Sequence, residues 1–354
     1  MDKKSEYRKI YKESFGDSDE FTEMFFDKVC REKEIMMLDI DGILASALLL
    51  KRFMMNFHGE IIPTGYICAA ATAKKMRGRG YMSDLILETL KKSFENGDYF
   101  VSLIPAERSL YPFYDRFGFT TVFYIQEERY TSAHKFRDGE GFFSFIYSAT
   151  DDKVRKAFNL LSSLRSGTLL FDNDDYDIIV EDNRLDNGEI VSAYNPETDS
   201  IDAVAVAVFD SERIIVRDIL YVSDIAREAV LSEVKRRFGE YPVTVIARPD
   251  DCANVRIEAR GMGRIVNLFS VLETIAATSP KLRAAIRVND RFLPQNNHIY
   301  VVDNGKVVIN DGFAGRLDLD VTQEVLTSII FSAPKVGMIF NLPAFRPFIS
   351  LMLE

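Results

Sequence analysis

The sequence predicts an α/β (α+β) protein with two tandem mixed sheets flanked by helices and a smaller C-terminal α+β domain. The main observation is that the order strand, strand, strand, helix, strand occurs twice along the chain. The second observation is the length of 354 residues, which suits two or three domains of roughly 100 to 200 residues each. Each predicted domain is large enough to bury a core of its own.

The first repeat follows from apolar periodicity and from turn residues. Its helices are expected at 7–15, 21–29, 85–94 and 111–117. Its strands are expected at 34–39, 43–53, 61–72, 99–104 and 119–125. Asp41 and Gly42 form a hairpin-type turn signal, and Asn96 with Gly97 stops the longest helix.

The second repeat keeps this order but has a different loop. Its helices are expected after the cap Asp151–Asp152 and at 223–238, and its strands at 189–194, 201–209, 213–221 and 243–246. Between its third strand and the following helix there is no glycine, and the first arginine is Arg227. The last ~90 residues, with a helix at 270–276 and strands at 282–288 and 299–302, suit a small α+β domain.

Composition excludes several classes of function. The chain has 44 Lys plus Arg against 54 Asp plus Glu and a net charge of −10, which argues against a nucleic-acid partner. Three dispersed cysteines and three dispersed histidines form neither a disulfide framework nor a metal site. The start carries no signal-peptide pattern, and the longest strongly apolar run, 42–50, is shorter than the ~18 to 20 residues of a membrane span. We therefore expect a soluble cytoplasmic protein without a membrane partner.

The segment that carries chemistry is the basic loop between the third strand and the long helix. It reads Arg77-Gly78-Arg79-Gly80-Tyr81-Met82. A helix N-terminus offers free N–H groups and a positive dipole end, glycines allow close backbone approach, and arginines add charged hydrogen bonds. This combination suits a pyrophosphate, and the alternative is a basic surface turn.

The loop and a second motif resemble the GNAT N-acetyltransferases. Arg77-x-x-Gly80-x-Met82 is similar to the acetyl-coenzyme A loop of that family, except that Met82 replaces a glycine or alanine. The segment 109–119, with Tyr114-x-Arg116-Phe117-Gly118-Phe119, resembles the Y-x-R-F-G-[FY] turn of the enhanced intracellular survival (Eis) type. Loop and turn lie about 30 residues apart, as that fold requires.

The resemblance to the Eis type covers the whole chain and implies three domains. These are a catalytic GNAT domain (1–132), a second GNAT-like domain without the coenzyme loop (133–261) and a sterol-carrier-protein-like domain (262–354). The third domain is suggested by its strand, by the D-x-x-x-P-x-N turn at Asp290, Pro294 and Asn296, and by its return strand.

The resemblance also implies the catalytic groups. Tyr114 would be the general acid that protonates the departing thiolate, and its alternative is one more core aromatic. The C-terminal carboxylate would reach the active site from the third domain as base or relay. Because the chain ends in Glu354, where relatives usually end in an aromatic residue, its main-chain and side-chain carboxylates are both candidates.

Acetyl-CoA is the implied cosubstrate, and no metal is expected. The matching positions that would bind it are Ala70, Thr72, Arg77, Gly78, Arg79, Gly80, Tyr81, Met82 and Ser109. Cys68 lies within an apolar strand without a nearby histidine, so a buried thiol is favoured over an acyl-cysteine intermediate. The acidic run 172–177 lacks the pattern of a calcium loop and is interpreted as a solvated turn.

Two functions follow from these observations. The first is direct acetyl transfer from acetyl-CoA to a primary amine of a cationic acceptor, such as a polyamine, an aminoglycoside or a lysine side chain. The alternative is a non-catalytic protein that binds an apolar ligand through the sterol-carrier-like domain. A homo-oligomer is left open, because no symmetric interface is legible in the sequence.

Overall fold

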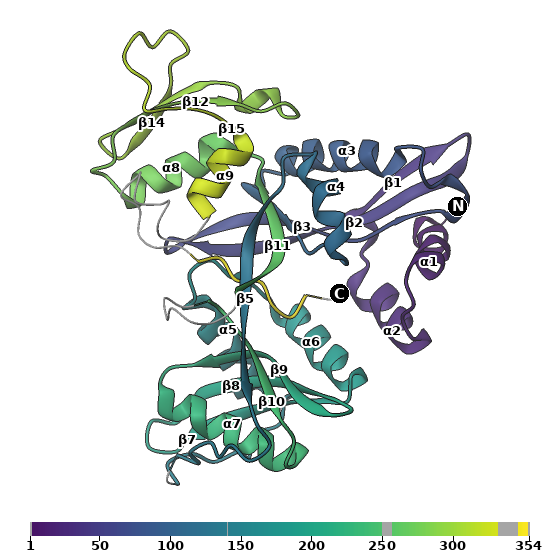
Figure 1. The fold of residues 1–354 in the computed structure, drawn as a ribbon, viewed down its shortest axis with the longest axis vertical. Helices are drawn as coiled ribbons and strands as arrows, with labels where there is room; N and C mark the ends of the chain where they lie inside the picture. Colours follow the sequence, from purple (N-terminus) through teal and green to yellow (C-terminus); the bar gives the residue numbers. More distant parts are fainter. Residues whose placement is uncertain (1, 140, 250–256, 332–345, 353–354) are drawn as a thin grey trace. The chain divides into compact units, whose positions relative to one another are not determined.

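The computed structural model describes residues 2–139, 141–249, 257–331 and 346–352, which divide into two compact units (Figure 1). The first unit comprises residues 1–123 and 259–347 together with 354, and the second comprises 124–258 and 348–353. Strand β5 (Thr120–Tyr130) begins in the first unit and ends in the second. The three predicted domains with boundaries after 132 and 261 stay a prediction.

The first unit contains a large sheet, a small sheet and their helices. Its helices are α1 (Lys3–Ser14), α2 (Asp19–Met24), α3 (Tyr81–Glu95), α4 (Tyr111–Asp115), α8 (Leu268–Thr278) and α9 (Gln323–Phe331). Its single turns are η1 (Phe25–Val29), η2 (Glu32–Glu34), η3 (Lys74–Met76), η4 (Arg108–Leu110) and η5 (Pro294–Asn296). Its strands, besides β5, are β1 (Ile35–Ile40), β2 (Ile43–Phe57), β3 (Glu60–Thr72), β4 (Phe100–Leu103), β11 (Ile257–Ile265), β12 (Ala284–Asn289), β13 (Ile299–Asp303), β14 (Lys306–Ile309) and β15 (Leu319–Thr322).

The large sheet of this unit has the order β1-β2-β3-β4-β11-β5. Strands β1, β2 and β3 are antiparallel, and β4 is parallel to β3. The predicted turn at Asp41 and Gly42 is confirmed, with both residues at positive φ (53° and 78°). The second and third strands are longer than predicted, because the ladder continues to Phe57 and turns at His58 and Gly59, also at positive φ.

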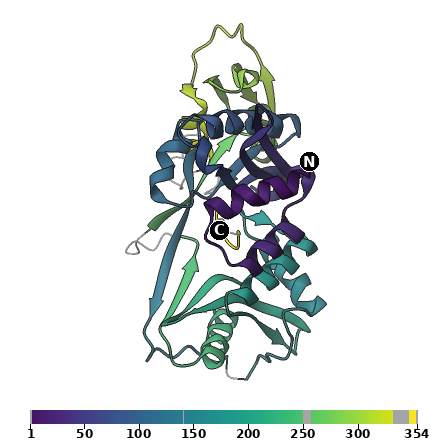
Figure 2. The ribbon, with the colours of Figure 1, turned by 90° about the vertical axis from the view of Figure 1, so that its right-hand side faces the viewer.

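Helices cover the two faces of the sheet and enclose its core. Leu85, Ile86 and Leu90 of α3 pack in one buried cluster with Leu48 of β2 and Ile67 of β3. Helix α1 also packs against β2 and β3, and Figure 1 shows it on the side opposite α3. Figure 2 shows α1 running across the strands on the side that faces the viewer. The alternating apolar residues of β2 are therefore buried on both faces.

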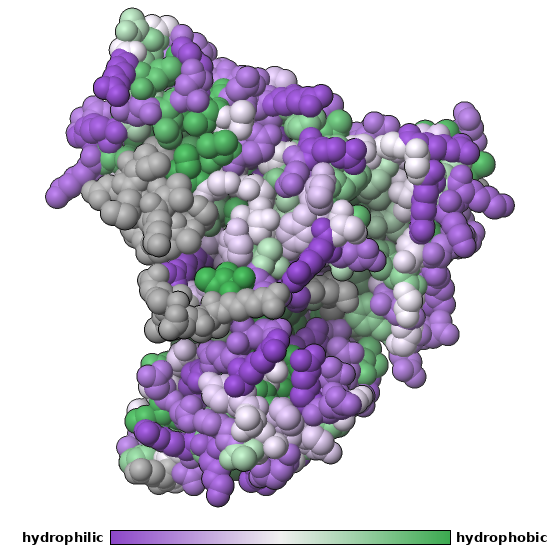
Figure 3. Space-filling view, in the orientation of Figure 1, coloured by the Kyte–Doolittle hydropathy of each residue, from purple (hydrophilic) through white to green (hydrophobic). Residues whose placement is uncertain are grey.

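The small sheet has the order β14-β13-β12-β15, in which β12 is antiparallel to β13 and parallel to β15. Helix α8 packs against β13 and β14, and α9 packs against β12 and β15. In Figure 3 hydrophobic residues gather over the region of this sheet and its helices. This is the small α+β arrangement that the sequence predicts, and its similarity to sterol carrier proteins stays a prediction.

The second unit repeats the topology of the first. Its elements are α5 (Asp152–Ser163), β6 (Leu169–Leu170), α6 (Asn173–Leu185), β7 (Gly188–Asn195), β8 (Ser200–Asp210), β9 (Arg213–Tyr221), α7 (Asp224–Phe238) and β10 (Val243–Ala247). Strands β7, β8 and β9 are antiparallel, and β10 is parallel to β9. Helix α7 connects β9 to β10 as α3 connects β3 to β4. The predicted duplication is confirmed, and so is the mixed α/β fold class.

One prediction in this unit is wrong. The acidic run 172–177 is not a solvated turn but the start of helix α6. The side chain of Asp172 accepts a hydrogen bond from the Asp175 amide, and the Asp175 carboxylate accepts one from the Asp172 amide. This capping box satisfies free amides, and acidic residues favour the positive end of the helix dipole. Dense acidic residues therefore start a helix here.

Candidate active site

The candidate site begins where β3 separates from β4. These parallel strands pair only between Thr64–Ile67 and Phe100–Leu103, whereas β3 continues to Thr72. The last residues of β3, 68–72, are paired with β2 on one side. In the part of the chain that the structure describes, β4 does not accompany them on the other side. An open strand edge of this kind presents backbone groups to an extended ligand.

A bulge redirects β3 at this point. Ala69 has a positive φ of 51°, and the register against β2 shifts between Ala47 and Leu49. The hydroxyl of Tyr7 on α1 donates a hydrogen bond of 2.6 Å to the Ala69 carbonyl. Burial raises the pKa of Tyr7 well above its usual value, so the hydroxyl keeps the proton that it donates. Helix α1 thus fixes the strand distortion next to Ala70.

The basic loop has the predicted geometry of an anion site. Gly78 and Gly80 have positive φ values of 76° and 88°, and a Cβ on either glycine would meet no atom within 4 Å. Gly80 is the N-cap of α3, and no side chain caps this helix. Its carbonyl accepts from the amides of Ser83 and Asp84. Among the described residues, the amides of Tyr81 and Met82 have no hydrogen-bond partner and remain free for an anion.

The two arginines of the loop differ in their contacts. Arg77 donates from Nε to the Thr72 carbonyl (3.1 Å) and from Nη2 to Ser14 Oγ at the end of α1 (2.9 Å). Arg79 is exposed, and its Nη1 contacts only the Met76 sulfur at 4.0 Å among the described residues. Arg77 therefore holds the loop against α1 and β3, whereas Arg79 has a guanidinium available for a ligand.

The bulky Met82 does not obstruct the loop. Its half-buried side chain packs against the core cluster of α3, which leaves only its backbone at the helix start. Ala70 packs against the same cluster, and Tyr114 belongs to it. The structure therefore brings the end of β3, the start of α3 and the tyrosine of α4 together around one core.

Tyr114 lies in a largely apolar setting. It is 7% exposed, and its ring makes edge contacts with Phe113 and Phe119. Burial raises the pKa of Tyr114 to about 12. Within the described residues its hydroxyl has no hydrogen-bond partner. A buried phenol that is protonated at neutral pH and has no committed partner can donate its proton to a reacting group.

Two further residues from the sequence analysis are Ser109, a predicted coenzyme contact, and Cys68, a thiol expected to be unreactive. Ser109 is exposed on η4, and its hydroxyl donates to the Glu107 carboxylate at 3.0 Å. Burial raises the pKa of the Cys68 thiol to about 12. A thiol of such a pKa carries almost no thiolate at neutral pH, which makes it a poor nucleophile. The interpretation of Cys68 as an unreactive core thiol agrees with this environment.

Glu354 lies outside the described residues, but the segment 348–352 before it packs within the second unit. Phe348, Ile349, Leu351 and Met352 are buried there. The Phe348 amide donates to the Gly167 carbonyl, and Ser350 Oγ donates to Asp218 at 2.7 Å. The apolar end of the chain is therefore docked, as its composition predicts.

The second unit has the same strand separation without the loop. Strand β10 pairs with β9 only over 214–216, and a register shift on β9 precedes Asp218. Here Arg165 donates to the Asp218 carboxylate (2.8 Å) and to the Ile219 carbonyl. Helix α7 is capped by Ser223, which accepts from the Ala226 amide. In the second unit the strand end and the helix start are thus hydrogen-bonded by the protein's own side chains, whereas in the first unit they are open.

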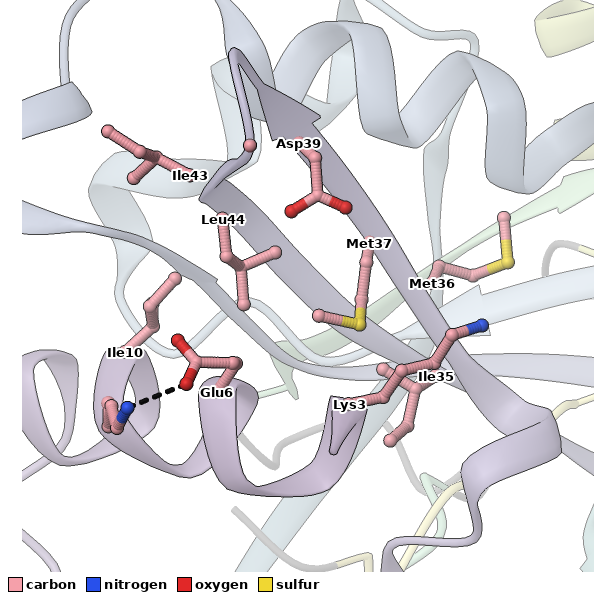
Figure 4. A pocket seen from close by; sticks show the side chains of 11 residues that line it. Lys3, Glu6, Ile10, Ile35, Met36, Met37, Asp39, Ile43 and Leu44 are labelled. Atoms are coloured by element: carbon pink, nitrogen blue, oxygen red, sulfur yellow. Dashed lines mark hydrogen bonds and ion pairs between the residues drawn. The ribbon is translucent and has the colours of Figure 1, made fainter. Parts of the chain in front are cut away.

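A separate groove of about 770 Å³ lies between α1 and β1 (Figure 4). Figure 4 shows Glu6 and Ile10 of α1 facing Met37 and Leu44 of the strands. Asp39 adds a second carboxylate to its lining. None of the predicted site residues lines this groove, and sequence reasoning did not identify it.

The residues of the first unit fit acetyl-CoA. Free amides at the start of α3, two glycines with open space and the exposed Arg79 suit a pyrophosphate, and the open edge of β3 suits an extended amide-bearing arm. Among the described residues, no cluster of three or more histidine, cysteine or acidic side chains could hold a metal ion.

The bulged strand β3, the glycine-bearing loop and the uncapped helix α3 all lie in a segment that matches a known family. Residues 2–122 match the family model described as an acetyltransferase (GNAT) domain. No curated protein sequence matches the chain. The predicted GNAT family and N-acetyltransferase class are thereby confirmed for this part of the chain.

Solved structures resemble the whole chain. A conserved protein of unknown function from Enterococcus faecalis V583 has a TM-score of 0.80 at 17% identity, covering 98% of this chain and 96% of that one. A GCN5-related N-acetyltransferase from Anabaena variabilis has 0.76 at 18%, with 98% and 95% covered. Eis1 from Mycobacterium abscessus has 0.72 at 14%, with 99% and 98% covered. At these identities the likeness shows a shared fold, which is the one that the sequence predicts.

Sequence reasoning missed the groups that hold the site in place. From α1, Tyr7 supports the end of β3 and Ser14 supports the loop, and Arg264 of β11 contacts the turn after Tyr114. These contacts join residues 62 to 147 positions apart, and no local pattern announces them. The one available signal is that Arg264 is a charged residue in an otherwise apolar run beginning at Met262.

Proposed function

We propose that this protein is an acetyl-CoA-dependent N-acetyltransferase that moves an acetyl group directly to a primary amine of a cationic acceptor. The observation that carries the proposal is the placement of Tyr114. This largely buried tyrosine, whose pKa is raised to about 12, belongs to the core against which Met82 at the start of α3 packs. The fold alone supports acyl transfer in general.

Tyr114 serves as the general acid in this proposal. The bound coenzyme supplies an acetyl thioester. A thiol has a pKa of ~8.5 and an ordinary tyrosine one of ~10, so the leaving thiolate is a weaker base than a phenolate. Burial keeps Tyr114 protonated at neutral pH, so a proton is present when the thiolate departs. Free amides at Tyr81 and Met82, together with Arg79, hold the coenzyme's phosphates.

The acceptor and the base complete the proposal. An amine attacks only when neutral, and an ordinary ammonium has a pKa of ~10.4, so a group must receive its proton. The carboxylate of Glu354, from the main chain or the side chain, takes this role as base or relay. The net charge of −10 favours a cationic acceptor over nucleic acid. We propose a cytoplasmic location for this reaction.

Among the described residues no helix has the length and apolar content needed to cross a membrane.

The direct test is a thiol-release assay with acetyl-CoA across polyamines, aminoglycosides and lysine peptides. We predict turnover with at least one acceptor, and Tyr114→Phe should lower kcat roughly 10²- to 10⁴-fold, because only the proton donor is lost. Tyr124→Phe on β5 is the control and should change kcat less than twofold. Absence of turnover with every acceptor, despite coenzyme binding, would contradict the proposal.

Two further variants separate the carboxylates of Glu354. Glu354→Gln removes the side-chain carboxylate and keeps the terminal one, whereas an added C-terminal glycine moves the terminal carboxylate and keeps the side chain. The change that lowers kcat identifies the group that acts. If neither change alters kcat or the pH profile, the C-terminus has no part in proton transfer.

The alternative function is binding of an apolar ligand through the small α+β region. Exposed Val308 and Ile309 on β14 and exposed Val325 on α9 support it. Titration with a fluorescent fatty acid tests this function. Saturable binding that Val308→Ser weakens, in a protein without acetyl transfer, would favour it over the enzyme.

A further inference from the structure

A buried polar cluster lies directly behind the turn that carries Tyr114. Its centre is Arg264 of β11, whose side chain is 0% exposed. Nη2 of Arg264 donates to Asp290 at 2.6 Å, and Nη1 donates to Gln323 Oε1 at 2.9 Å. Both members of the ion pair are fully buried. A charge buried to this extent is retained only where its partners are fixed.

Arg264 makes its remaining polar contact with the backbone of the Tyr114 turn. Nη1 donates a hydrogen bond of 2.8 Å to the Phe117 carbonyl. The Phe117 amide in turn donates to the Tyr114 carbonyl at 2.9 Å, so the turn closes onto the residue that carries the phenol. A guanidinium at the end of a helical turn is also favoured by the local dipole.

Gly118 shows how close this contact is. Its φ is +80°, and a Cβ at this position would lie 2.0 Å from Nη1 of Arg264. The glycine of the Y-x-R-F-G-[FY] motif is therefore required both for its backbone conformation and for the approach of the guanidinium. Phe292 packs beside this contact, with its ring 5.7 Å from the guanidinium carbon.

The D-x-x-x-P-x-N turn holds Arg264 from the other side. Asp290 Oδ1 also accepts from the amides of Phe292 and Leu293, and its Oδ2 accepts from Asn296 Nδ2. Asn296 further donates to the Val266 carbonyl and accepts from the Leu268 amide. The carboxylate is thereby fixed before it meets the guanidinium. A motif that the acetyl-transfer proposal leaves unused thus has a defined structural task.

We propose that Arg264, held by Asp290 and Gln323, is the positioning residue for the Tyr114 hydroxyl. It acts through the Phe117 carbonyl and touches no reacting group. The inference rests on the proposed function, because it assigns Arg264 to the general acid of that reaction. The small α+β region then contributes to acetyl transfer by setting where the phenol lies.

The test is a double-mutant cycle on kcat with Arg264→Lys and Tyr114→Phe. Lysine keeps the buried charge but loses the planar fork that reaches both Asp290 and Phe117. We expect Arg264→Lys to lower kcat about 10- to 100-fold with the KM for acetyl-CoA within twofold. In the double variant, kcat should equal that of Tyr114→Phe alone, because the phenol being positioned is absent. If the fold-losses in kcat of the two single variants multiply in the double variant, the inference is overturned.

Two companion variants control for folding. Arg287→Lys on β12 changes an exposed ion pair with Asp320 on the neighbouring strand β15 and should leave kcat unchanged. If Arg264→Lys does not fold, Gln323→Met takes its place in the test. It removes one acceptor of Arg264 at similar volume, and we expect it to lower kcat about threefold. An unchanged kcat in folded Gln323→Met would then overturn the inference.

A spectroscopic readout separates this inference from the proposed function. In protein containing 3-fluorotyrosine, the ¹⁹F resonance of residue 114 is assigned by its loss in Tyr114→Phe. We expect Arg264→Lys, but not Arg287→Lys, to shift this resonance whether or not an acceptor is known. An unmoved resonance would overturn the inference, whereas absence of turnover in the unaltered protein would bear on the proposed function alone.

Discussion

At the scale of single residues, burial decides what the ionisable side chains can do. Tyr7, Cys68 and Tyr114 all lie in apolar surroundings of the first unit, and burial raises the pKa of each. The consequences differ with the partner. Tyr7 uses its proton on the Ala69 carbonyl, the Cys68 thiol stays unreactive, and Tyr114 keeps a proton without a hydrogen-bond partner among the described residues.

Burial also makes His58 a pH-sensitive residue. It lowers the pKa of His58 from 6.5 to about 4, so the fold favours the neutral ring. The stability that this provides is complete above pH 6.5 and is lost as the pH falls towards 4. We predict that the unfolding free energy falls by about 2 to 3 kcal/mol between pH 7 and 4.5 through this residue.

Urea unfolding at both pH values measures the effect. His58→Asn is the matched variant, because asparagine tolerates the positive φ of 53° at this turn. The variant should lack the His58 share of the acid loss. If His58→Asn and the unaltered protein lose the same stability between the two pH values, the ring is not held neutral.

At the scale of elements, the two units show how one topology can be open or closed. Strand β3 and the start of α3 present free backbone groups, whereas β9 is engaged by Arg165 and α7 is capped by Ser223. The loss of the glycine-bearing loop in the second unit therefore comes with side chains that satisfy the exposed backbone. Asp218, the partner of Arg165, also accepts a hydrogen bond from Ser350 of the C-terminal segment.

Asp218 is predicted to hold the segment 348–352 in place. Asp218→Asn weakens the hydrogen bonds to Arg165 and Ser350, so hydrogen exchange in this segment should rise and the unfolding free energy should fall by about 1 to 3 kcal/mol. Asp210→Asn, in an exposed ion pair with Arg213, is the control and should cost less than about 1 kcal/mol. Unchanged exchange in Asp218→Asn would show that the segment is docked by apolar contacts alone.

Sequence patterns predicted these elements where the information is local. The glycine-bearing loop, the Asp41 and Gly42 turn and the helix expected at 223–238 depend on neighbouring residues, and the structure has them where the patterns indicate. The prediction of a solvated turn at 172–177 was wrong because a capping box and a solvated turn share the same acidic composition. Strand β11 could not be placed, because its pairing with β4 joins residues about 160 positions apart.

At the scale of the molecule, the candidate site of the first unit depends on distant parts of the chain. Strand β11 and the small α+β region support the Tyr114 turn through Arg264, and these residues follow the second unit in sequence. This explains why the sequence could indicate the glycine-bearing loop and the tyrosine but not their supports. A local pattern indicates candidate ligand-binding residues, whereas packing across the chain decides how they are held.

The measurement that tests the central claim most directly is calorimetric titration of acetyl-CoA into the purified protein. We predict one site, weakened about tenfold (about 1.4 kcal/mol) by Arg79→Ala, whose guanidinium is available at the loop. Lys91 is an exposed cation on helix α3, which follows the loop. The control variant Lys91→Ala should bind acetyl-CoA as the unaltered protein does. No binding by well-folded protein, or equal binding by Arg79→Ala, would contradict the assignment of the loop as the coenzyme site.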